Sequence, residues 1–328
     1  MSSATGEGGG GRAEAPGGQR AGGGSEGQAR AGAVAPGPGR QPATAGEMLA
    51  MARSFLLRKE LPEGRLEAEL LVARALEMDR LGLFMSLDRP VSGAEVDLAR
   101  DYLVRRGRRE PTAYIIGRRE FYCRDFGVGP GVLIPRPETE LLVDRARELA
   151  AKRPADSPLR IAELGTGSGC LAVTLALELP RAQVIATDIS KAALELARTN
   201  GQSLGAQVEF VEGDGLAPLV ERVERDGPYD MLLSNPPYIG ADEAAQLAPE
   251  VREHEPPEAL FAPAGERDYW LNLLLTEGVQ LLAPGGHLLV ELGASQGGAA
   301  RGLCADLGLA CDVRPDLAGL DRVLELTR

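Results

Sequence analysis

Strand and helix patterns alternate along the chain from Glu138 to the C-terminus, and this alternation constrains the fold more than any other feature. Short apolar runs that predict buried strands lie at 160–164, 184–187, 208–211, 230–234 and 287–292. Helical spacing of apolar residues predicts helices at 138–151, 170–178, 190–203 and 268–282, and a last helix and two short strands follow. Such alternation is typical of an α/β fold with a mostly parallel sheet and helices on both of its faces.

The residues before Glu138 differ in composition and divide into three segments. Residues 1–45 are rich in Gly, Ala, Pro and Gln, so we expect a disordered tail that cannot bury enough surface to offset its ordering entropy. Residues 46–110 carry leucines and methionines at helical spacing and are expected to form a small helical domain. The pattern at 111–137 is β-like, which predicts a hairpin that links this domain to an α/β domain at 138–328.

Local signals add detail to the first half of the chain. Ser92 and Glu95 fit a capping box that opens a helix. The arginine run at 105–109 ends this helix, and it is either a solvated helix end or a surface for an acidic partner. In the hairpin region, glycines separate the runs that predict strands, which lie at 114–116, 120–122 and 132–134.

Charge and cysteine content narrow the class of protein. The net charge is −12, and residues 121–328 hold 18 basic and 32 acidic side chains. This acidic balance disfavours a nucleic-acid partner, which needs a basic surface. We find no apolar run long enough for a membrane span and no apolar signal-peptide segment. The four cysteines form no C-x-x-C pair and His254 and His287 are the only histidines, so we expect no metal site and a cytoplasmic protein with reduced cysteines.

A glycine-rich loop joins the first strand of the α/β part to the next helix. Its residues are Gly165, Thr166, Gly167, Ser168 and Gly169. Glycines here let the backbone approach a ligand closely at a helix N-terminus, although a tight turn needs the same residues. A dinucleotide-binding fingerprint would place Gly or Ala at the sixth position, which is Cys170 in this chain.

Two aspartates follow the next two strands. Asp188 lies 19 residues after Gly169, where a carboxylate can accept both hydroxyls of a ribose or can cap the helix that follows. Asp214 and Gly215 follow the third strand, where they can bind an adenine amino group or form an ordinary turn. Because the carboxyl ends of parallel strands meet at one edge of a sheet, we expect these residues to lie beside the glycine loop.

The strand at 230–234 ends in Ser234-Asn235-Pro236-Pro237-Tyr238. Neither proline can donate to a β ladder, so the strand stops and the carbonyls of Asn235 and Pro236 are held in fixed positions. Together with the side-chain oxygen of Asn235, these acceptors can grip a planar –NH2 group. The alternatives are a proline-rich turn and a half-buried core tyrosine at Tyr238.

These motifs, in this order, resemble the class I S-adenosylmethionine-dependent methyltransferases. More narrowly, the chain resembles the HemK/PrmC family of peptide chain release factor glutamine methyltransferases over about residues 46–328, on the stretches 111–117, 133–140, 234–238 and 254–260. The resemblance implies a Rossmann-like sheet with a small helical substrate-binding domain before it. It also implies that S-adenosylmethionine binds to Gly165, Thr166, Gly167, Ser168, Gly169, Asp188, Asp214, Gly215 and Asn235.

The resemblance further implies that the acceptor is the side-chain amide of the Gln in a release factor's Gly-Gly-Gln motif. Asn235 and Pro236 would accept its two N–H groups, Tyr238 would pack on the amide plane, and Pro237 would complete the substrate contact. Asn235, Pro236 and Tyr238 are therefore the expected catalytic residues. Other residues in the matching stretches could equally be salt bridges or helix starts; these are Arg136, Glu138 and His254.

Three other functions stay open at this point. They are a ribosomal-protein glutamine methyltransferase, an adenine-amino methyltransferase on nucleic acid, and a non-catalytic cofactor-binding module. The acidic balance disfavours the second, and the intact glycine loop with Asp188 and Asn235 disfavours the third. We expect a monomer. The tail also contains Gly17-Gly18-Gln19, which spells the target motif; chance is the favoured explanation in such a composition, and self-methylation is the rival.

Overall fold

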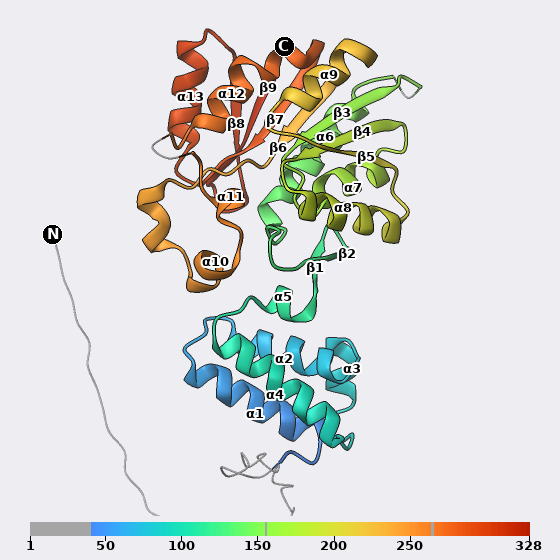
Figure 1. Cartoon of the computed structure of the whole chain (residues 1–328), viewed down its shortest axis with the longest axis vertical. Helices are drawn as coiled ribbons and strands as arrows, with labels where there is room; N and C mark the ends of the chain where they lie inside the picture. Colours follow the sequence, from blue (N-terminus) through green and yellow to red (C-terminus); the bar gives the residue numbers. More distant parts are fainter. Residues whose placement is uncertain (1–40, 155, 264–265) are drawn as a thin grey trace, which may run out of the picture.

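The computed structural model describes residues 41–154, 156–263 and 266–328, which form a helical bundle and an α/β part (Figure 1). The expected tail, up to residue 40, and its Gly17-Gly18-Gln19 sequence lie outside the described residues. Residues 43–45 belong to the helical bundle, ahead of the expected boundary at 46. The carbonyl of Ala43 accepts a hydrogen bond from the backbone of Val91, and the side chain of Thr44 accepts one from the backbone of Glu47 to cap the first helix.

The bundle is built from helices whose leucines, methionines and alanines share one core. These helices are α1 (Ala45–Arg58), α2 (Gly64–Ala75), α3 (Arg80–Met85) and α4 (Gly93–Gly107). The predicted capping box is confirmed at the start of α4. The backbone N–H of Ser92 donates to the Glu95 carboxylate over 2.7 Å, and the Ser92 hydroxyl accepts from the backbone of Glu95 over 3.3 Å.

A short helix stands where the first strand of the linker was expected. The prediction of a strand at 114–116 is wrong, because these residues lie in α5 (Thr112–Ile116). The Pro111 carbonyl accepts from the backbones of Tyr114 and Ile115 and starts the turn, and Gly117 ends it with a φ of 82°. The large side chains of Tyr114 and Ile115 are buried in the packing of this helical turn and do not belong to a strand, which explains why the run resembled one in the sequence.

The hairpin is shorter than expected and occupies only β1 (Arg118–Phe121) and β2 (Arg124–Gly127). Its turn residues Tyr122 and Cys123 both have positive φ angles, which suits a two-residue hairpin turn. Residues 132–134, all of which are described, form no strand. The expected three-strand linker is therefore one helix, one hairpin and an extended segment.

The α/β part contains a seven-stranded sheet, as the alternating pattern predicted. Its strand order is β5 (Val208–Glu212), β4 (Ala182–Asp188), β3 (Leu159–Leu164), β6 (Tyr229–Ser234), β7 (Leu282–Glu291), β9 (Asp321–Thr327) and β8 (Cys311–Pro315). The first five strands are parallel, and β9 runs antiparallel to both β7 and β8. The prediction of a mostly parallel α/β fold is confirmed.

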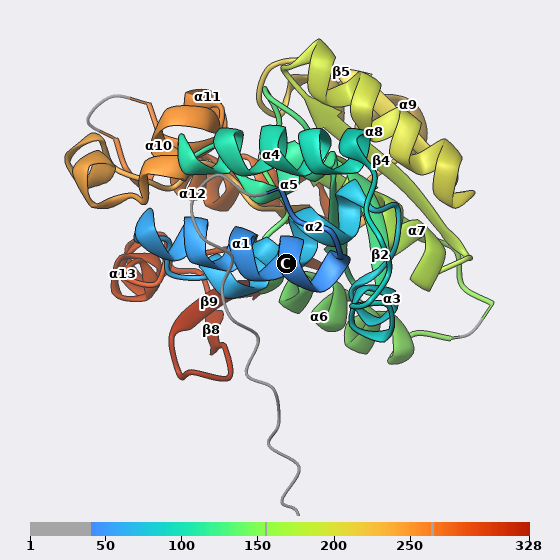
Figure 2. The same cartoon turned by 90° about the horizontal axis from the view of Figure 1, so that it is seen from below.

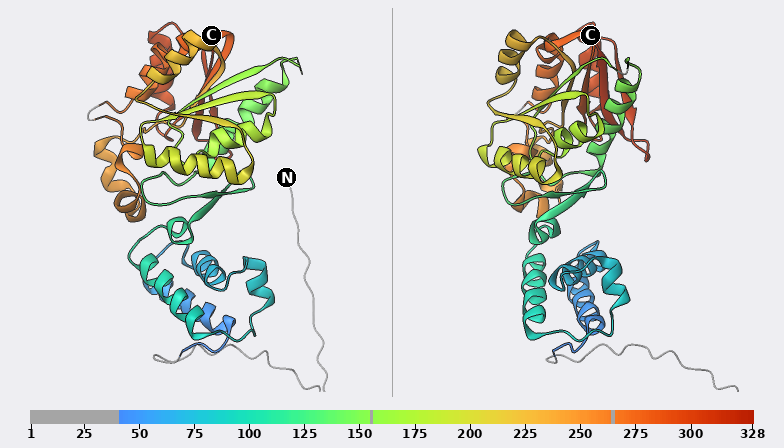
Figure 3. Two further views of the ribbon diagram at one scale, coloured as in Figure 1. Left: turned by 45° about the vertical axis from the view of Figure 1, so that its right-hand side comes forward. Right: turned by 90° about the vertical axis from the view of Figure 1, so that its right-hand side faces the viewer.

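Helices cover both faces of this sheet (Figure 3). Successive residues of β6 pack into opposite cores, with Met231 and Leu233 on one face and Leu232 on the other. The first face is covered by α6 (Glu140–Ala151), α7 (Cys170–Glu178) and α8 (Lys191–Leu204). The second is covered by α9 (Ala217–Asp226), α12 (Tyr269–Thr276), η3 (Gly278–Leu281) and α13 (Gly297–Asp306). Helix α9 was not predicted, and α12 ends six residues before the expected limit of 282.

The bundle meets the α/β part through α5, the hairpin and a contact between α4 and α10 (Pro249–His254) (Figure 2). Arg106 in α4 donates to Glu67 in α2 over 3.0 Å and to Glu250 in α10 over 2.9 Å, and only 2% of its surface is exposed. A solvated helix end is therefore the wrong interpretation for Arg106, which holds the two parts together. Among the described residues, no helix is long and apolar enough to cross a membrane.

Candidate functional site

The pairing of β3 with β6 defines the centre of the site. Leu164 lies opposite Ser234 in the parallel ladder, and the Ser234 hydroxyl donates to the Leu164 carbonyl over 2.9 Å. The next residues, Gly165 and Asn235, therefore leave the sheet side by side. The other neighbour of β3 is β4, which ends at Asp188. Open parallel sheets bind ligands at the carboxyl edge where the connections diverge in this way.

The glycine loop after β3 presents its backbone, because two of its side chains point into the protein. Gly165 and Thr166 each donate a backbone N–H to the Thr187 carbonyl over 2.9 Å. Gly169 has a φ of 79°, and a Cβ there would lie 2.9 Å from the Cβ of Ala197, so only glycine fits. Thr166 and Ser168 are 3% and 2% exposed. A ligand at this edge would meet the loop's backbone and not these two side chains.

A buried carboxylate near the end of β3, that of Glu163, is hydrogen-bonded to the glycine loop. It accepts a hydrogen bond from the Thr166 hydroxyl over 2.6 Å and another from the backbone N–H of Ala172 in the first turn of α7. Burial raises the pKa of Glu163 to about 8, and the nearby Asp188 adds to the increase. Glu163 thus joins the loop to the helix that follows it.

Asp188 is also tied to the loop. Its Oδ2 accepts from the backbone N–H of Gly167 over 2.8 Å, and its Oδ1 accepts from the backbone of Ser190 over 2.9 Å. The side chain of Ser190, not that of Asp188, caps helix α8. Burial raises the pKa of Asp188, and these backbone hydrogen bonds oppose the increase. Each carboxylate oxygen keeps a second lone pair for a further donor.

Asp214 and Gly215 lie just past β5, the strand next to β4. Asp214 is exposed, and Gly215 has a φ of 53°. The structure thus brings Asp214 to the same edge as Asp188, one strand further from the centre.

Asn200, which sequence reasoning missed, fixes the glycine loop to the hairpin. From α8, its Nδ2 donates to the Ser168 carbonyl over 2.8 Å and to the Gly127 carbonyl over 3.0 Å, and its Oδ1 accepts from the Gly127 backbone over 2.8 Å. Its side chain is buried among partners that lie far away in the chain. No local sequence signal could have identified it.

Asn235 is held by a second residue that was not predicted. Its Nδ2 donates to the hydroxyl of Thr139 over 3.0 Å, and that hydroxyl donates to Glu291 over 2.6 Å. Thr139 ends the short helix η1 (Pro137–Thr139), and Glu291 ends β7. A carboxylate at the end of an otherwise apolar strand was the available signal for Glu291. Among the residues that the structure describes, none donates a hydrogen bond to Oδ1 of Asn235, so this oxygen can accept one from a ligand.

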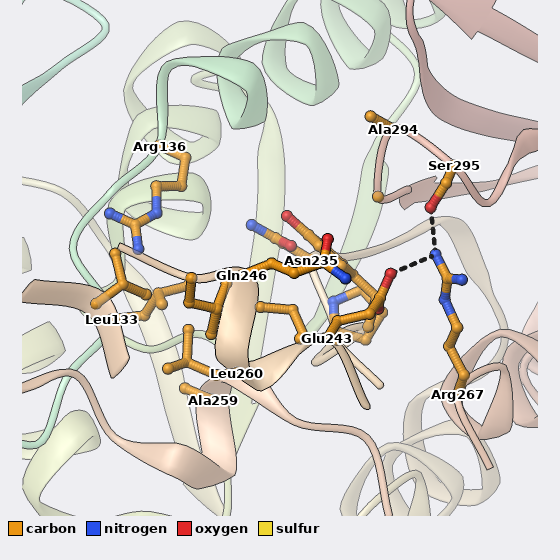
Figure 4. A pocket seen from close by; sticks show the side chains of 16 residues that line it. Leu133, Arg136, Asn235, Glu243, Gln246, Ala259, Leu260, Arg267, Ala294 and Ser295 are labelled. Carbon is orange, nitrogen blue, oxygen red and sulfur yellow. Dashed lines mark hydrogen bonds and ion pairs between the residues drawn. The ribbon is translucent and has the colours of Figure 1, made fainter. Parts of the chain in front are cut away.

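A cavity of about 400 Å³ opens in front of Asn235 (Figure 4). Asn235, Pro236 and Tyr238 form one wall, and Leu133 and Arg136 contribute to another. The remaining walls come from η2 (Ala241–Gln246), α10, α11 (Pro257–Leu260), Arg267 and residues 293–295. The glycine loop is not part of this cavity. Asn235 therefore stands between the loop's edge of the sheet and the cavity.

Tyr238 closes the wall by packing on a glycine backbone. A Cβ at Gly293 would lie 3.0 Å from the Tyr238 ring, so a side chain at this position would require the ring to shift. Burial raises the pKa of the Tyr238 hydroxyl. The ring therefore stays neutral at physiological pH.

Ion pairs hold the other walls. Arg136 pairs with Glu255 over 2.5 Å, and Glu255 also accepts from the backbone of Ile134 over 3.0 Å. Glu138 lies 3.8 Å from Arg322, and His254 ends α10. On the far side, Arg267 contacts Ser295 and Glu243, as Figure 4 shows.

Comparison with known proteins decides the family. Residues 47–117 match the model of the PrmC N-terminal domain, and residues 139–252 match that of the methyltransferase small domain. The release factor glutamine methyltransferase of Geobacter sulfurreducens is 39% identical over 279 residues, which cover 85% of this chain and 94% of that protein. The chain belongs to the release factor glutamine methyltransferase family. The Chlorobaculum tepidum member is 42% identical over 284 residues, which cover 85% of this chain and 95% of that protein.

The family membership confirms the resemblance seen in the sequence. A solved methyltransferase from Pyrococcus furiosus superposes with a TM-score of 0.43 at 17% identity, covering 63% of this chain and 90% of that one. Within the described part of the chain, no group of three or more His, Cys, Asp or Glu side chains could hold a metal ion. The roles of individual residues in this family member stay predictions.

We predict that Glu163→Gln changes how stability depends on pH. The pKa of Glu163 is raised from 4.5 to about 8 in the folded protein, so its protonated form favours folding at low pH, and this contribution is lost as the pH rises toward 8. From about pH 5 to about pH 8 the wild type should lose on the order of 3 kcal/mol relative to the variant. Urea unfolding at several pH values measures this.

The exposed Glu224→Gln change in α9 is the matched control and should follow the wild type. If Glu163→Gln also follows the wild type at every pH, burial does not raise the pKa of Glu163.

Proposed function

We propose that this chain transfers a methyl group from S-adenosylmethionine to the side-chain amide nitrogen of the Gln in the Gly-Gly-Gln motif of peptide chain release factors. The names of its relatives, which are about 40% identical over the aligned residues, support this activity. The observation that carries the proposal is the place of Asn235 in the cavity wall next to Pro236, with its Nδ2 on Thr139 and no donor among the described residues to its Oδ1. Oδ1 of Asn235 and the carbonyl of Pro236 suit the two N–H groups of a primary amide.

The edge formed by β3, β4 and β5 suits the cofactor. The backbone of Gly165, Gly167 and Gly169 would face its amino-acid part, the second lone pairs of Asp188 would accept ribose hydroxyls, and Asp214 would accept from the adenine amino group. Thr166 and Ser168 would act through their backbone atoms because their side chains are buried. When bound, the cofactor supplies a methyl group on a positively charged sulfur.

The acceptor amide would be activated by orientation and not by a strong base. An amide nitrogen is a poor nucleophile because its lone pair is delocalised into the carbonyl. If Asn235 and Pro236 accept its two N–H groups, the lone pair is turned toward the methyl group, and the acceptors stabilise the positive charge that develops on nitrogen. The methylated nitrogen would then lose one of its two protons to solvent, which gives the neutral N-methyl amide. Tyr238, which lines the same wall, would pack on the amide plane.

The cavity and the bundle suit a protein substrate. Glycines beside the target Gln would let a loop enter the cavity without side-chain clashes. Arg106 joins the bundle to α10, and Val251 of α10 lines the cavity. A substrate body held by the bundle would therefore be connected to the wall that its loop enters. The acidic balance of residues 121–328 disfavours a nucleic-acid acceptor.

Two substitutions should separate chemistry from cofactor binding. Asn235→Asp places a negative charge beside the acceptor and should lower kcat by about 100-fold or more, while the Kd for S-adenosylmethionine changes little. Asp188→Asn removes a charge and an acceptor and should raise that Kd by about 10-fold. Single-turnover kinetics and calorimetry measure the two quantities.

Asn272→Asp, an exposed change of the same chemistry on α12, is the control and should leave both quantities unchanged. A kcat for Asn235→Asp within about twofold of the wild type would remove Asn235 from its assigned role.

The acceptor is tested with purified protein and radiolabelled S-adenosylmethionine. We expect methyl transfer to a release factor, none to its Gly-Gly-Gln variant with Ala in place of Gln, and none to duplex DNA or ribosomal RNA. Methylation of nucleic acid with an untouched release factor would favour the adenine-amino alternative. Methylation of ribosomal proteins alone would favour the ribosomal alternative.

A further inference from the structure

We propose that Thr139 and Glu291 are positioning residues that fix the orientation of the Asn235 amide for methyl transfer. This inference rests on the proposed function, in which Oδ1 of Asn235 must accept from the substrate. A terminal amide presents two nearly isosteric ends, a carbonyl oxygen that accepts and an NH2 group that donates. If the amide were rotated by 180°, its NH2 group would meet the substrate's NH2 group and no hydrogen bond could form.

Three separate elements bring these side chains together. Because Ser234 lies opposite Val290 in the ladder, Asn235 and Glu291 leave β6 and β7 next to each other. Thr139 reaches them from η1, whose position is set by the Arg136–Glu255 pair just before it. Thr139 is 3% exposed and Glu291 is 1% exposed, so water does not compete for these contacts.

A count of protons gives the direction of each hydrogen bond. An ionised carboxylate only accepts, so the single hydroxyl proton of Thr139 goes to Glu291 over 2.6 Å. The Thr139 oxygen is then left only as an acceptor for Asn235, at 3.0 Å. Asn235 must therefore turn its Nδ2 to Thr139 and its Oδ1 to the cavity. If Glu291 takes up a proton, it can donate to Thr139, whose own proton is then free to draw Oδ1 away from the cavity.

Burial places the protonation of Glu291 near neutral pH, and the neighbouring charges modify it. Burial raises the pKa of Glu291 to about 7; the Thr139 hydrogen bond opposes the increase, Glu138 adds to it, and Arg322 and Arg136 oppose it. Tyr238 and Cys170 also face this carboxyl, and burial keeps both of them neutral. The ionised form that orients Asn235 should therefore become more populated as the pH rises through about 7, and kcat should rise with it.

Two threonine variants test the hydroxyl. Thr139→Val keeps the shape but removes both hydrogen bonds, and it should lower kcat roughly 10- to 100-fold with little change in the Kd for S-adenosylmethionine. Thr139→Ser restores the hydroxyl and should recover most of the activity. Thr174→Val is the matched control, because the buried hydroxyl of Thr174 in α7 has no hydrogen-bond partner within the described part of the chain. Equal kcat values for Thr139→Val and the wild type would overturn the proposal.

The pH dependence tests the carboxylate. We expect the rise of kcat near pH 7 in the wild type and its absence in Glu291→Gln. Because the raised pKa means that ionised Glu291 opposes folding above its ordinary range, the Tm of Glu291→Gln at pH 8 should equal or exceed that of the wild type. A loss of activity would then not reflect unfolding. An unchanged acid limb in Glu291→Gln would contradict the role of Glu291.

An NMR measurement tests the orientation without any methyl transfer. The side-chain NH2 signal of Asn235, assigned by its loss in Asn235→Asp, should titrate near pH 7 in the wild type and in Thr139→Ser. It should not titrate in Glu291→Gln, and it should shift in Thr139→Val. If the wild type fails to methylate a release factor but shows this titration, the proposed function is wrong and the positioning contacts stand. If it is active without the titration, the positioning role is wrong.

Discussion

The parallel pairing of β3 with β6 is the constraint on which the rest of the site depends. It joins stretches about 70 residues apart, and the buried hydrogen bond from Ser234 to Leu164 closes the ladder at its last step. The residues expected to contact the cofactor and the substrate lie at the same edge of the sheet. The glycine loop follows β3, Asp188 ends β4 and Asn235 follows β6. The cavity lies beyond Asn235, so one amide side chain stands between the proposed cofactor edge and the proposed acceptor.

Two buried carboxylates support this edge, and both are unfavourable for folding when ionised. Burial raises the pKa of Glu163 and of Glu291, which shows that each folded environment resists the charge. Each carboxylate still accepts hydrogen bonds that a hydrophobic residue could not accept: Glu163 from Thr166 and the start of α7, Glu291 from Thr139. These two carboxylates thus lower the stability of the fold when they are ionised, but their hydrogen bonds fix the positions of the groups that would contact the ligands.

Local chemistry could be predicted from the sequence, and distant partnerships could not. The glycine loop and the turn at Asn235 were found because backbone freedom and proline rigidity act within a few residues. Thr139, Glu291 and Asn200 were missed because their partners come from elements that only the fold brings together. The strand expected at 114–116 was wrong because apolar, β-branched residues also fill a buried helical turn. The domain boundaries and the monomeric state stay predictions.

The central claim is that Oδ1 of Asn235 and the Pro236 carbonyl hold the acceptor amide. A crystal structure with S-adenosylhomocysteine and a peptide containing Gly-Gly-Gln tests this claim most directly. We predict that the glutamine nitrogen lies within hydrogen-bond distance of both oxygens, with Nδ2 of Asn235 still on Thr139. A glutamine amide bound elsewhere in the cavity, or one that meets Nδ2 of Asn235 instead of Oδ1, would contradict it.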